Sequence, residues 1–407
     1  MKRFFILLIA VFYASSILAQ NINFNTGKIK QKRYLQEIPY KKIMELPIVA
    51  VTINGKIYNF LFDTGATLAI SERLDKELNP PVIGWATGAS SSGERERVKC
   101  IQLPLLQMQE LIFTNTSGVV FHEKSKLIEC FGVDGIIGSN MLRNSVVHFD
   151  EKSEHIIITN DIKKLSVNKK VYQKMQLCIQ SRPLITVSLQ KGGKEVIINN
   201  VLFDSGYNGF YNIPINSYNE LNNHVNIGDK IAESEGSLSF GFLGFDKIQN
   251  HLLLNIPKLI INNMTFNDVI INTTHNTKSL LGSELLQYGK TTLDYKKRRF
   301  YFEPYDNINT SNISFKGPWA IGSILQNNKR VVSMIWDKAL ESQINIGDEI
   351  LNINGTDFQS VNLCELFTLE SILDNDSDIR VFELKDINTE EVKKIEIKRM
   401  RYTKTAH

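Results

Sequence analysis

Alternating apolar and polar positions run through most of this chain, and they predict β-strands rather than helices. Apolar residues recur through residues 48–62 and are interrupted by an Asn-Gly pair at Asn54. An Asn-Gly pair between two such runs is typical of a tight β-hairpin turn. The same plan recurs over residues 184–203, around Gly192-Gly193. We therefore predict two similar β-hairpins, one in each half of the first 300 residues.

The two hairpins open an internal repeat. Each runs into an Asp-hydroxyl-Gly triplet, which begins at Asp63 in the first copy and at Asp204, 141 residues later, in the second. A hydrophobic-hydrophobic-Gly-Ser run follows each triplet, at residues 136–139 and 280–283, and a strand ending in Asp comes next in both copies. Landmarks that recur in one order at a nearly constant offset indicate a duplicated all-β unit of about 140 residues.

The pattern changes after Pro304, where a polar linker at residues 307–312 precedes a separate C-terminal module. Within that module we predict a helical stretch over residues 363–373 and strands over residues 379–384 and 392–397. The predicted organisation is listed in chain order: a leader at 1–20, a first unit at 21–165, a second unit at 166–306 and the C-terminal module at 310–402.

The leader has the layout of a secretory signal peptide. Lys2 and Arg3 precede an almost wholly apolar run at residues 4–13, and small residues lead to a plausible cleavage point at Ala19-Gln20. A retained membrane anchor is the alternative, but the apolar run is short for crossing a bilayer. We expect the protein to be exported, either to a periplasm or out of the cell.

Composition and charge argue against several classes of function. The chain has 407 residues, 43% of them hydrophobic and 22% charged, which is ordinary for a globular protein. The net charge of +4 gives no support to nucleic-acid or membrane-surface binding, so we expect no nucleic-acid partner. The histidines form no nucleophile elbow and no H-E-x-x-H helix motif.

The four cysteines lack the spacing of a zinc site or of a redox motif. Cys100 and Cys130 lie in one unit, and two outcomes stay open for them: a disulfide formed after export, or unpaired buried thiols. We expect no metal and no other cofactor.

Asp63 and Asp204 are the candidates for chemistry. Two carboxyl groups within hydrogen-bond reach share one proton, because like charges at that range do not both ionise. The ionised member can take a proton from an attacking water while the protonated member donates to a carbonyl oxygen, which is what amide hydrolysis requires. Gly65 and Gly206 permit the close approach of the two loops. The Thr64 and Ser205 hydroxyls can join one loop to the other.

These motifs resemble a known family. Asp63-Thr64-Gly65-Ala66 with residues 136–138 resembles one lobe of a retropepsin-like aspartic protease of the pepsin/retropepsin superfamily, and Asp204-Ser205-Gly206 with residues 280–282 resembles the other. The resemblance covers residues 45–305. It implies two homologous β-barrel lobes in one chain, with catalytic Asp63 and Asp204 at their seam. Since both aspartates lie on one chain, we expect a monomer.

The resemblance also implies a flap, a glycine-rich hairpin over the site. One candidate is residues 84–93, with Gly84, Trp85 and Gly88, and the other is residues 234–244, with Gly236. The alternative is two surface hairpins without a role in binding. The second unit departs from the family pattern, because Tyr207 replaces the usual small residue after the triplet and would either crowd the aspartates or point away into its own lobe.

The segment 339–355, with Gly347-Asp348-Glu349-Ile350 at its centre, resembles the heart of a bacterial PDZ domain, a small α+β fold. Such domains capture a peptide C-terminus as an added strand. The resemblance implies a peptide-binding module, and a β-rich cap on the protease is the alternative.

The function that fits best is an exported aspartic endopeptidase acting on peptides or proteins, with a PDZ module for peptide or substrate binding. The alternative is a catalytically inactive peptide-binding protein of the same fold. A third interpretation, two aspartates in unrelated structural corners, does not explain the matched repeat.

Overall fold

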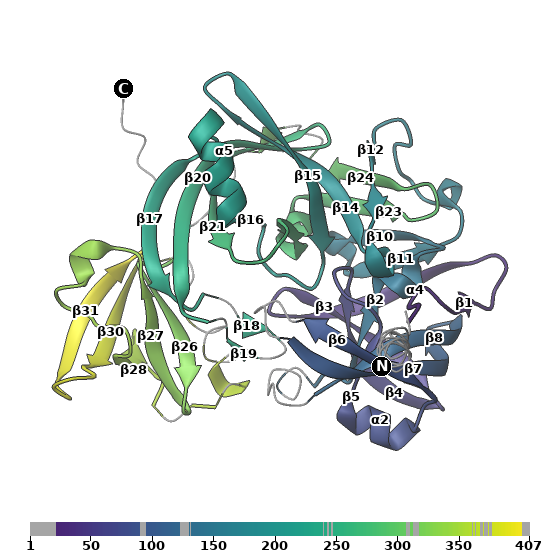
Figure 1. Cartoon of the computed structure of the whole chain (residues 1–407), viewed down its shortest axis with the longest axis horizontal. Coiled ribbons are helices and arrows are strands. Elements are labelled where there is room, and N and C mark those ends of the chain that lie inside the picture. Colours follow the sequence, from purple (N-terminus) through teal and green to yellow (C-terminus); the bar gives the residue numbers. More distant parts are fainter. Residues whose placement is uncertain are drawn as a thin grey trace, which may run out of the picture.

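The computed structural model confirms that this is a mainly β protein, and its described strands form three large sheets and a two-stranded ribbon, with only short helices (Figure 1). The structure describes residues 22–89, 95–122, 130, 132–238, 240–241, 244–245, 247–306, 310–311, 317–359, 361–362, 364–366, 369, 373 and 377–400. The predicted signal peptide at residues 1–20 lies outside them, as does most of the predicted linker. Among the described residues, none of the helices has the length and apolar character needed to span a bilayer.

The first sheet is the largest and is strongly curved. Its strands are, in spatial order, β12 (Gln173–Lys174), β24 (Arg299–Pro304), β23 (Gly289–Asp294), β10 (Val146–Asp150), β11 (His155–Thr159), β2 (Leu35–Ile43), β3 (Leu46–Ile53), β4 (Lys56–Asp63), β9 (Gly135–Gly138), β5 (Ala69–Ser71), β8 (Leu111–Phe121), β7 (Arg95–Met108) and β6 (Val82–Ala89), with β1 (Lys28–Ile29) paired to β8. β10 pairs with β23, so this sheet crosses the predicted unit boundary at residue 165.

The second sheet comes from the second copy of the repeat. Its order is β13 (Gln176–Leu177), β14 (Pro183–Lys191), β15 (Lys194–Asp204), β22 (Leu280–Gly282), β16 (Tyr211–Pro214), β21 (Met264–Thr274), β20 (Gln249–Ile261) and β17 (Asp229–Gly236), with β25 (Thr310–Ser311) on β21. A separate two-stranded ribbon joins β18 (Phe240–Gly241) to β19 (Gly244–Phe245). One hydrophobic core runs through both sheets.

The third sheet forms the C-terminal module. Its order is β26 (Ile321–Gln326), β27 (Lys329–Ile335), β28 (Glu349–Ile353), β30 (Ile379–Lys385) and β31 (Val392–Lys398), with β29 (Thr356–Asp357) on β28. The strands predicted at 379–384 and 392–397 are therefore confirmed, whereas most of the predicted helical stretch 363–373 lies outside the described residues. The module has a hydrophobic cluster of its own.

The helices are short and lie at the ends of strands. They are α2 (Glu72–Leu78), α4 (Ser139–Leu142) and α5 (Ile215–Val225), with 3-10 turns η1 (Glu151–Ser153), η2 (Ile162–Lys164), η3 (Ile179–Ser181), η4 (Ser283–Gln287) and η5 (Lys338–Leu340). Both predicted hairpins are confirmed as β3–β4 and β14–β15. The residues at both turns have positive φ, 52° at Asn54 and 56° at Gly192, as tight hairpin turns require.

The C-terminal module is docked on β17 of the second sheet. The Ser333 hydroxyl donates to the Ser237 carbonyl (3.0 Å), and the Ile335 amide donates to the Ser234 hydroxyl (3.1 Å). Met334 and Trp336 are buried with Leu253 in a small cluster at this contact. In Figure 1 the yellow-green module accordingly lies beside β17 and β20.

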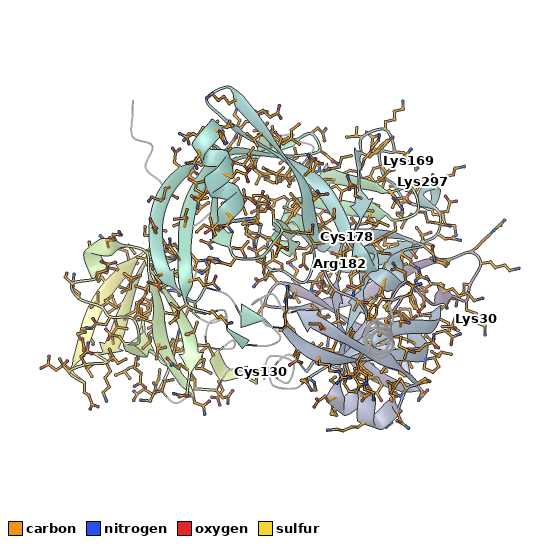
Figure 2. All side chains as sticks on the ribbon, viewed as in Figure 1. Lys30, Cys130, Lys169, Cys178, Arg182 and Lys297 are labelled. Atoms are coloured by element: carbon orange, nitrogen blue, oxygen red, sulfur yellow. A yellow bond between two sulfur atoms is a disulfide. The ribbon has the colours of Figure 1, made fainter. Side chains whose placement is uncertain are left out.

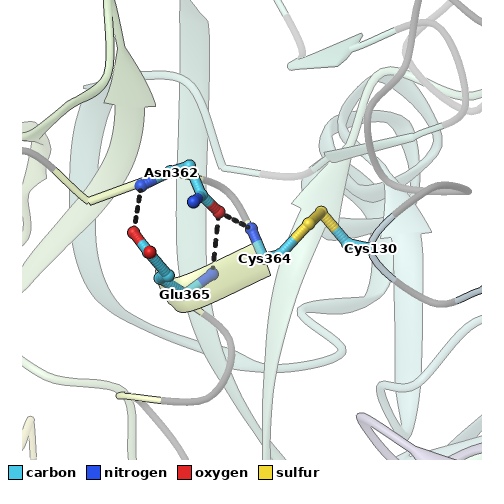
Figure 3. Close-up of a disulfide and its surroundings, with 4 residues drawn as sticks. All are labelled: Cys130, Asn362, Cys364 and Glu365. Atoms are coloured by element: carbon cyan, nitrogen blue, oxygen red, sulfur yellow. Dashed lines mark hydrogen bonds between the residues drawn. A yellow bond between two sulfur atoms is a disulfide. The ribbon is translucent and has the colours of Figure 1, made fainter.

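A disulfide also ties this module to the first sheet. Cys130, shortly before β9, is bonded to Cys364 (Figure 3). Cys100 is buried and free. The Cys100–Cys130 disulfide that the sequence left open is therefore not formed. The Asn362 carboxamide accepts from the amides of Cys364 and Glu365, and the Glu365 carboxylate accepts from the Asn362 amide. This reciprocal cap holds the turn that carries Cys364.

Candidate active site

Two strand ends bring the predicted aspartates together. Asp63 ends β4, which runs parallel to β9, and Asp204 ends β15, which runs parallel to β22. The two hydrophobic-hydrophobic-Gly runs are thus the short buried strands beside the Asp-bearing strands. A Cβ at Gly138 would overlap the backbone of Thr67, so the close crossing of loop and strand requires glycine there.

The two loops are joined by four reciprocal hydrogen bonds. The Thr64 hydroxyl accepts from the Ser205 amide (3.0 Å) and donates to the Phe203 carbonyl (2.7 Å). The Ser205 hydroxyl accepts from the Thr64 amide (3.1 Å) and donates to the Phe62 carbonyl (2.8 Å). Both hydroxyl residues are fully buried. The prediction that these hydroxyls join one loop to the other agrees with this geometry.

The carboxyl groups face each other across the two loops. Asp63 accepts from the Gly65 amide (2.7 Å), Asp204 accepts from the Gly206 amide (2.9 Å), and each carboxyl group shifts the pKa of the other. Each glycine lies against the carboxylate of the other loop. A Cβ at Gly65 would overlap Asp204, and a Cβ at Gly206 would overlap Asp63. Glycine at both positions is therefore a steric requirement of this arrangement.

Burial raises the pKa of Asp63 and of Asp204 above their ordinary value. The negative charge of Asp204 raises the pKa of Asp63 further. The hydrogen bond from Asp63 and the amide of Gly206 oppose the rise in the pKa of Asp204, because both stabilise its ionised form. Two carboxyl groups in this environment hold one proton between them over a wide pH range.

Two buried hydroxyl groups, those of Tyr295 and Ser139, support the loop that carries Asp63. The Tyr295 and Ser139 hydroxyls are 2.9 Å apart, and Ser139 donates to the Thr64 carbonyl (2.7 Å). That carbonyl shares a peptide unit with the Gly65 amide, which donates to Asp63. Polarisation of the peptide unit therefore strengthens the hydrogen bond to the carboxylate. Tyr295 was not predicted as a site residue, because the sequence does not show that the turn after β23 reaches this loop.

Tyr207 turns back into its own half of the molecule. A Cβ at Gly209 would overlap the Tyr207 phenol, and a Cβ at Gly282 would lie 2.7 Å from its ring, so the side chain packs against these two glycines. Burial raises the pKa of its hydroxyl to about 12, and Asn212 partly opposes the rise. Of the two predicted orientations, the structure has the one that points away into the lobe.

The flap candidates occupy two different settings. Gly84, Trp85 and Gly88 lie on β6, the edge strand of the first sheet, and the tip at residues 90–94 lies outside the described residues. Trp85 is 51% exposed and carries Arg97 over its ring. Gly236, in contrast, ends β17 where a Cβ would overlap the Ser333 carbonyl. Its small size serves the docking of the C-terminal module.

Within the described part of the chain, no group of three or more His, Cys, Asp or Glu side chains is placed to hold a metal ion.

Comparison with known proteins gives one family match. A family model described as "Aspartyl protease" matches residues 49–141, which include Asp63, β9 and Ser139. No curated protein matches the chain. Among solved structures, the crystal structure of basic 7S globulin from soybean is similar over 66% of this chain and 96% of its own, with 9% sequence identity and a TM-score of 0.37.

Proposed function

We propose that this protein is an exported aspartic endopeptidase in which Asp63 and Asp204 activate one water molecule. The observation that carries the proposal is the reciprocal frame of Thr64 and Ser205, which joins the two loops that bear Asp63 and Asp204. The family match to residues 49–141 supports a protease function for the part that contains Asp63. The second copy of the repeat supplies Asp204 with the same geometry.

The reaction needs no group besides the dyad. The ionised carboxylate takes a proton from water as the water oxygen attacks the peptide carbonyl carbon, and the protonated carboxyl donates its proton to the carbonyl oxygen. Collapse of the gem-diol intermediate breaks the C–N bond as the proton gained from water passes to the departing nitrogen, and one gem-diol hydroxyl returns its proton to the other carboxylate as the product carbonyl re-forms. Asp63 and Asp204 then again share one proton. The Gly65 and Gly206 amides stabilise the ionised form at each stage.

The wider architecture is part of the proposal. The two copies of the repeat act as two lobes with the dyad at their seam, and the hairpins that include β6 and the segment after β17 cover the bound peptide. We further propose that the C-terminal module binds peptides as a PDZ-like domain. Its support is the strand order, which leaves β26 at an edge of the third sheet, where an extended peptide can be added as a strand.

The test removes one carboxylate at a time. Asp63→Asn and Asp204→Asn should each lower peptide hydrolysis on the order of 10⁴-fold or more, and the double variant should be scarcely worse than either, because coupled catalytic residues are non-additive. Asp357→Asn, at an exposed position of β29 in the C-terminal module, is the matched control and should keep full activity. Full turnover by purified Asp204→Asn would refute the shared-water mechanism and favour the alternative, a peptide-binding protein without catalysis.

A further inference from the structure

A lysine-rich segment crosses the outer face of the first sheet. After β11 the chain passes through η2 and then pairs with β24 as β12. Apolar side chains of this segment pack on the sheet against Tyr301, namely those of Ile162, Leu165 and Val167. Five exposed lysines lie between and after them: Lys163, Lys164, Lys169, Lys170 and Lys174.

The turn between β23 and β24 adds further cations beside this segment. It contains Lys296, Lys297 and Arg298, all exposed. The Met175 amide donates to the Arg298 carbonyl (2.8 Å), and Lys174 is the register partner of Arg299. Figure 2 shows Lys169 and Lys297 on the same side of the molecule. We call the exposed set the basic face: Lys163, Lys164, Lys169, Lys170, Lys174, Lys296, Lys297 and Arg298.

Three acidic residues lie near this face, against its eight cationic residues, and each accepts a hydrogen bond from a backbone amide. Asp294 is 1% exposed and accepts from the Lys297 amide, and Asp161 accepts from the Lys163 amide. Glu303 accepts from the Asn168 amide. Among the ion pairs of the described residues, none involves a side chain of the basic face. A net charge of +4 for the whole chain therefore conceals a strongly cationic surface.

Exposed apolar groups lie among these cations. Val171 and Tyr172 are 36% and 40% exposed and lie between Lys170 and Lys174. The guanidinium of Arg299 stacks over the Tyr172 ring at 4.1 Å, which supports the ring at the surface. Cations spread over a face, with an aromatic and an aliphatic group between them, fit the interface of a bilayer better than a single small anion in a pocket.

The basic face is on the far side of the first sheet from the dyad. Successive residues of a strand point to opposite faces. Phe300 packs on Phe203, the residue before Asp204, with ring centroids 5.6 Å apart. Its neighbours Arg299 and Tyr301 therefore point to the other face, where the lysine-rich segment lies. A surface bound to the basic face would leave the dyad accessible.

We propose that the basic face binds the surface of a lipid bilayer rich in anionic phospholipids, and that it holds the enzyme there with its active site turned away from the membrane. This inference does not depend on the catalytic mechanism. Each basic residue near an anionic membrane strengthens partitioning roughly fivefold. Binding should weaken as salt rises, because the contact is electrostatic.

The experiment measures cosedimentation of the purified protein with vesicles of phosphatidylcholine alone or with about one-third phosphatidylglycerol, in low and in physiological salt. The variant Lys163→Gln/Lys164→Gln/Lys169→Gln/Lys170→Gln should bind the anionic vesicles about two to three orders of magnitude more weakly. The matched control carries the same charge change at exposed lysines outside the face: Lys76→Gln/Lys194→Gln/Lys258→Gln/Lys398→Gln.

The control variant should bind like the unmodified protein, and both variants should unfold at an unchanged temperature. Tyr172→Ser should lower binding by a factor that salt does not change, since it removes apolar contact rather than charge. Equal loss in the two quadruple variants, or equal binding to neutral and anionic vesicles, would overturn the proposal. So would displacement from the vesicles by stoichiometric single-stranded DNA or heparin, which would identify a soluble polyanion as the better partner.

Discussion

Removal of one hydroxyl from the frame around the dyad is the most direct test of how the site is held together. Thr64→Val keeps the shape of the side chain and deletes the oxygen that accepts from the Ser205 amide and donates to the Phe203 carbonyl. Thr64 is 0% exposed, so water does not easily replace either partner.

The expected loss in free energy of unfolding follows from the Ser205 amide and the Phe203 carbonyl, which lose their hydrogen-bond partner. A buried donor or acceptor left without a partner costs about 1–3 kcal/mol. Thr64→Val leaves one donor and one acceptor unpaired, so the free energy of unfolding should fall by about 2–6 kcal/mol. Domains are typically stable by about 5–15 kcal/mol, so the variant should fold but unfold at clearly lower urea concentration. Turnover should fall as well, because the loops that aim the carboxyl groups are joined through this oxygen.

Urea unfolding at neutral pH measures the change, and Thr67→Val is the matched control. Thr67 lies three residues further along the same loop and is 8% exposed, and its hydroxyl has no hydrogen-bond partner among the described residues. The same substitution there should leave stability unchanged or slightly higher. Equal stability of Thr64→Val and Thr67→Val would refute the argument that the reciprocal hydrogen bonds hold the halves together.

Three further predictions concern the carboxyl pair and the two tyrosines near it. Burial raises the pKa of Asp63 in the folded state. The stabilisation from its proton is therefore present at acid pH and is lost as pH rises through that raised pKa. Asp63→Asn should exceed the unmodified protein in stability against urea at neutral pH, and the difference should close below pH about 4. Tyr207→Phe should leave turnover unchanged, because the phenol packs against Gly209 and Gly282, and a large loss of turnover would place the phenol in the mechanism. Tyr295→Phe should shift the acid limb of the pH–rate profile to higher pH and lower kcat with KM unchanged, because it weakens the support of the Asp63 carboxylate through Ser139. If the acid limb stays at the same pH, the Tyr295 hydroxyl has only a structural role.

Local features of the sequence were sufficient to predict the elements that carry the site. The Asn-Gly turn and the alternation around it predicted β3–β4, and the repeat predicted β14–β15, because turn conformation and strand alternation depend on neighbouring residues. The paired triplets predicted that Asp63 and Asp204 belong together. The two glycines in those triplets had the expected role, since no Cβ fits at either position.

Contacts between distant segments were not predictable in the same way. Cys130 pairs with Cys364, 234 residues away, rather than with Cys100. Gly236, named as a flap candidate, gives the C-terminal module room to dock, a contact that the local sequence does not indicate. Tyr295 reaches the Asp63 loop only because β23 joins the first sheet. In each of these three contacts, the sequence around one residue contains no motif that identifies its distant partner.

The sequence by itself therefore determined the strands, the repeat and the identity of the two carboxyl groups. The tertiary structure alone decided which distant segments meet, and with that the hydroxyl chain beneath Asp63, the disulfide and the basic face. The physical reason is that strand alternation is set residue by residue, whereas the pairing of β12 with β24 depends on the burial of the whole core. Net charge is a sum over the chain, and only the fold determines where the charges lie.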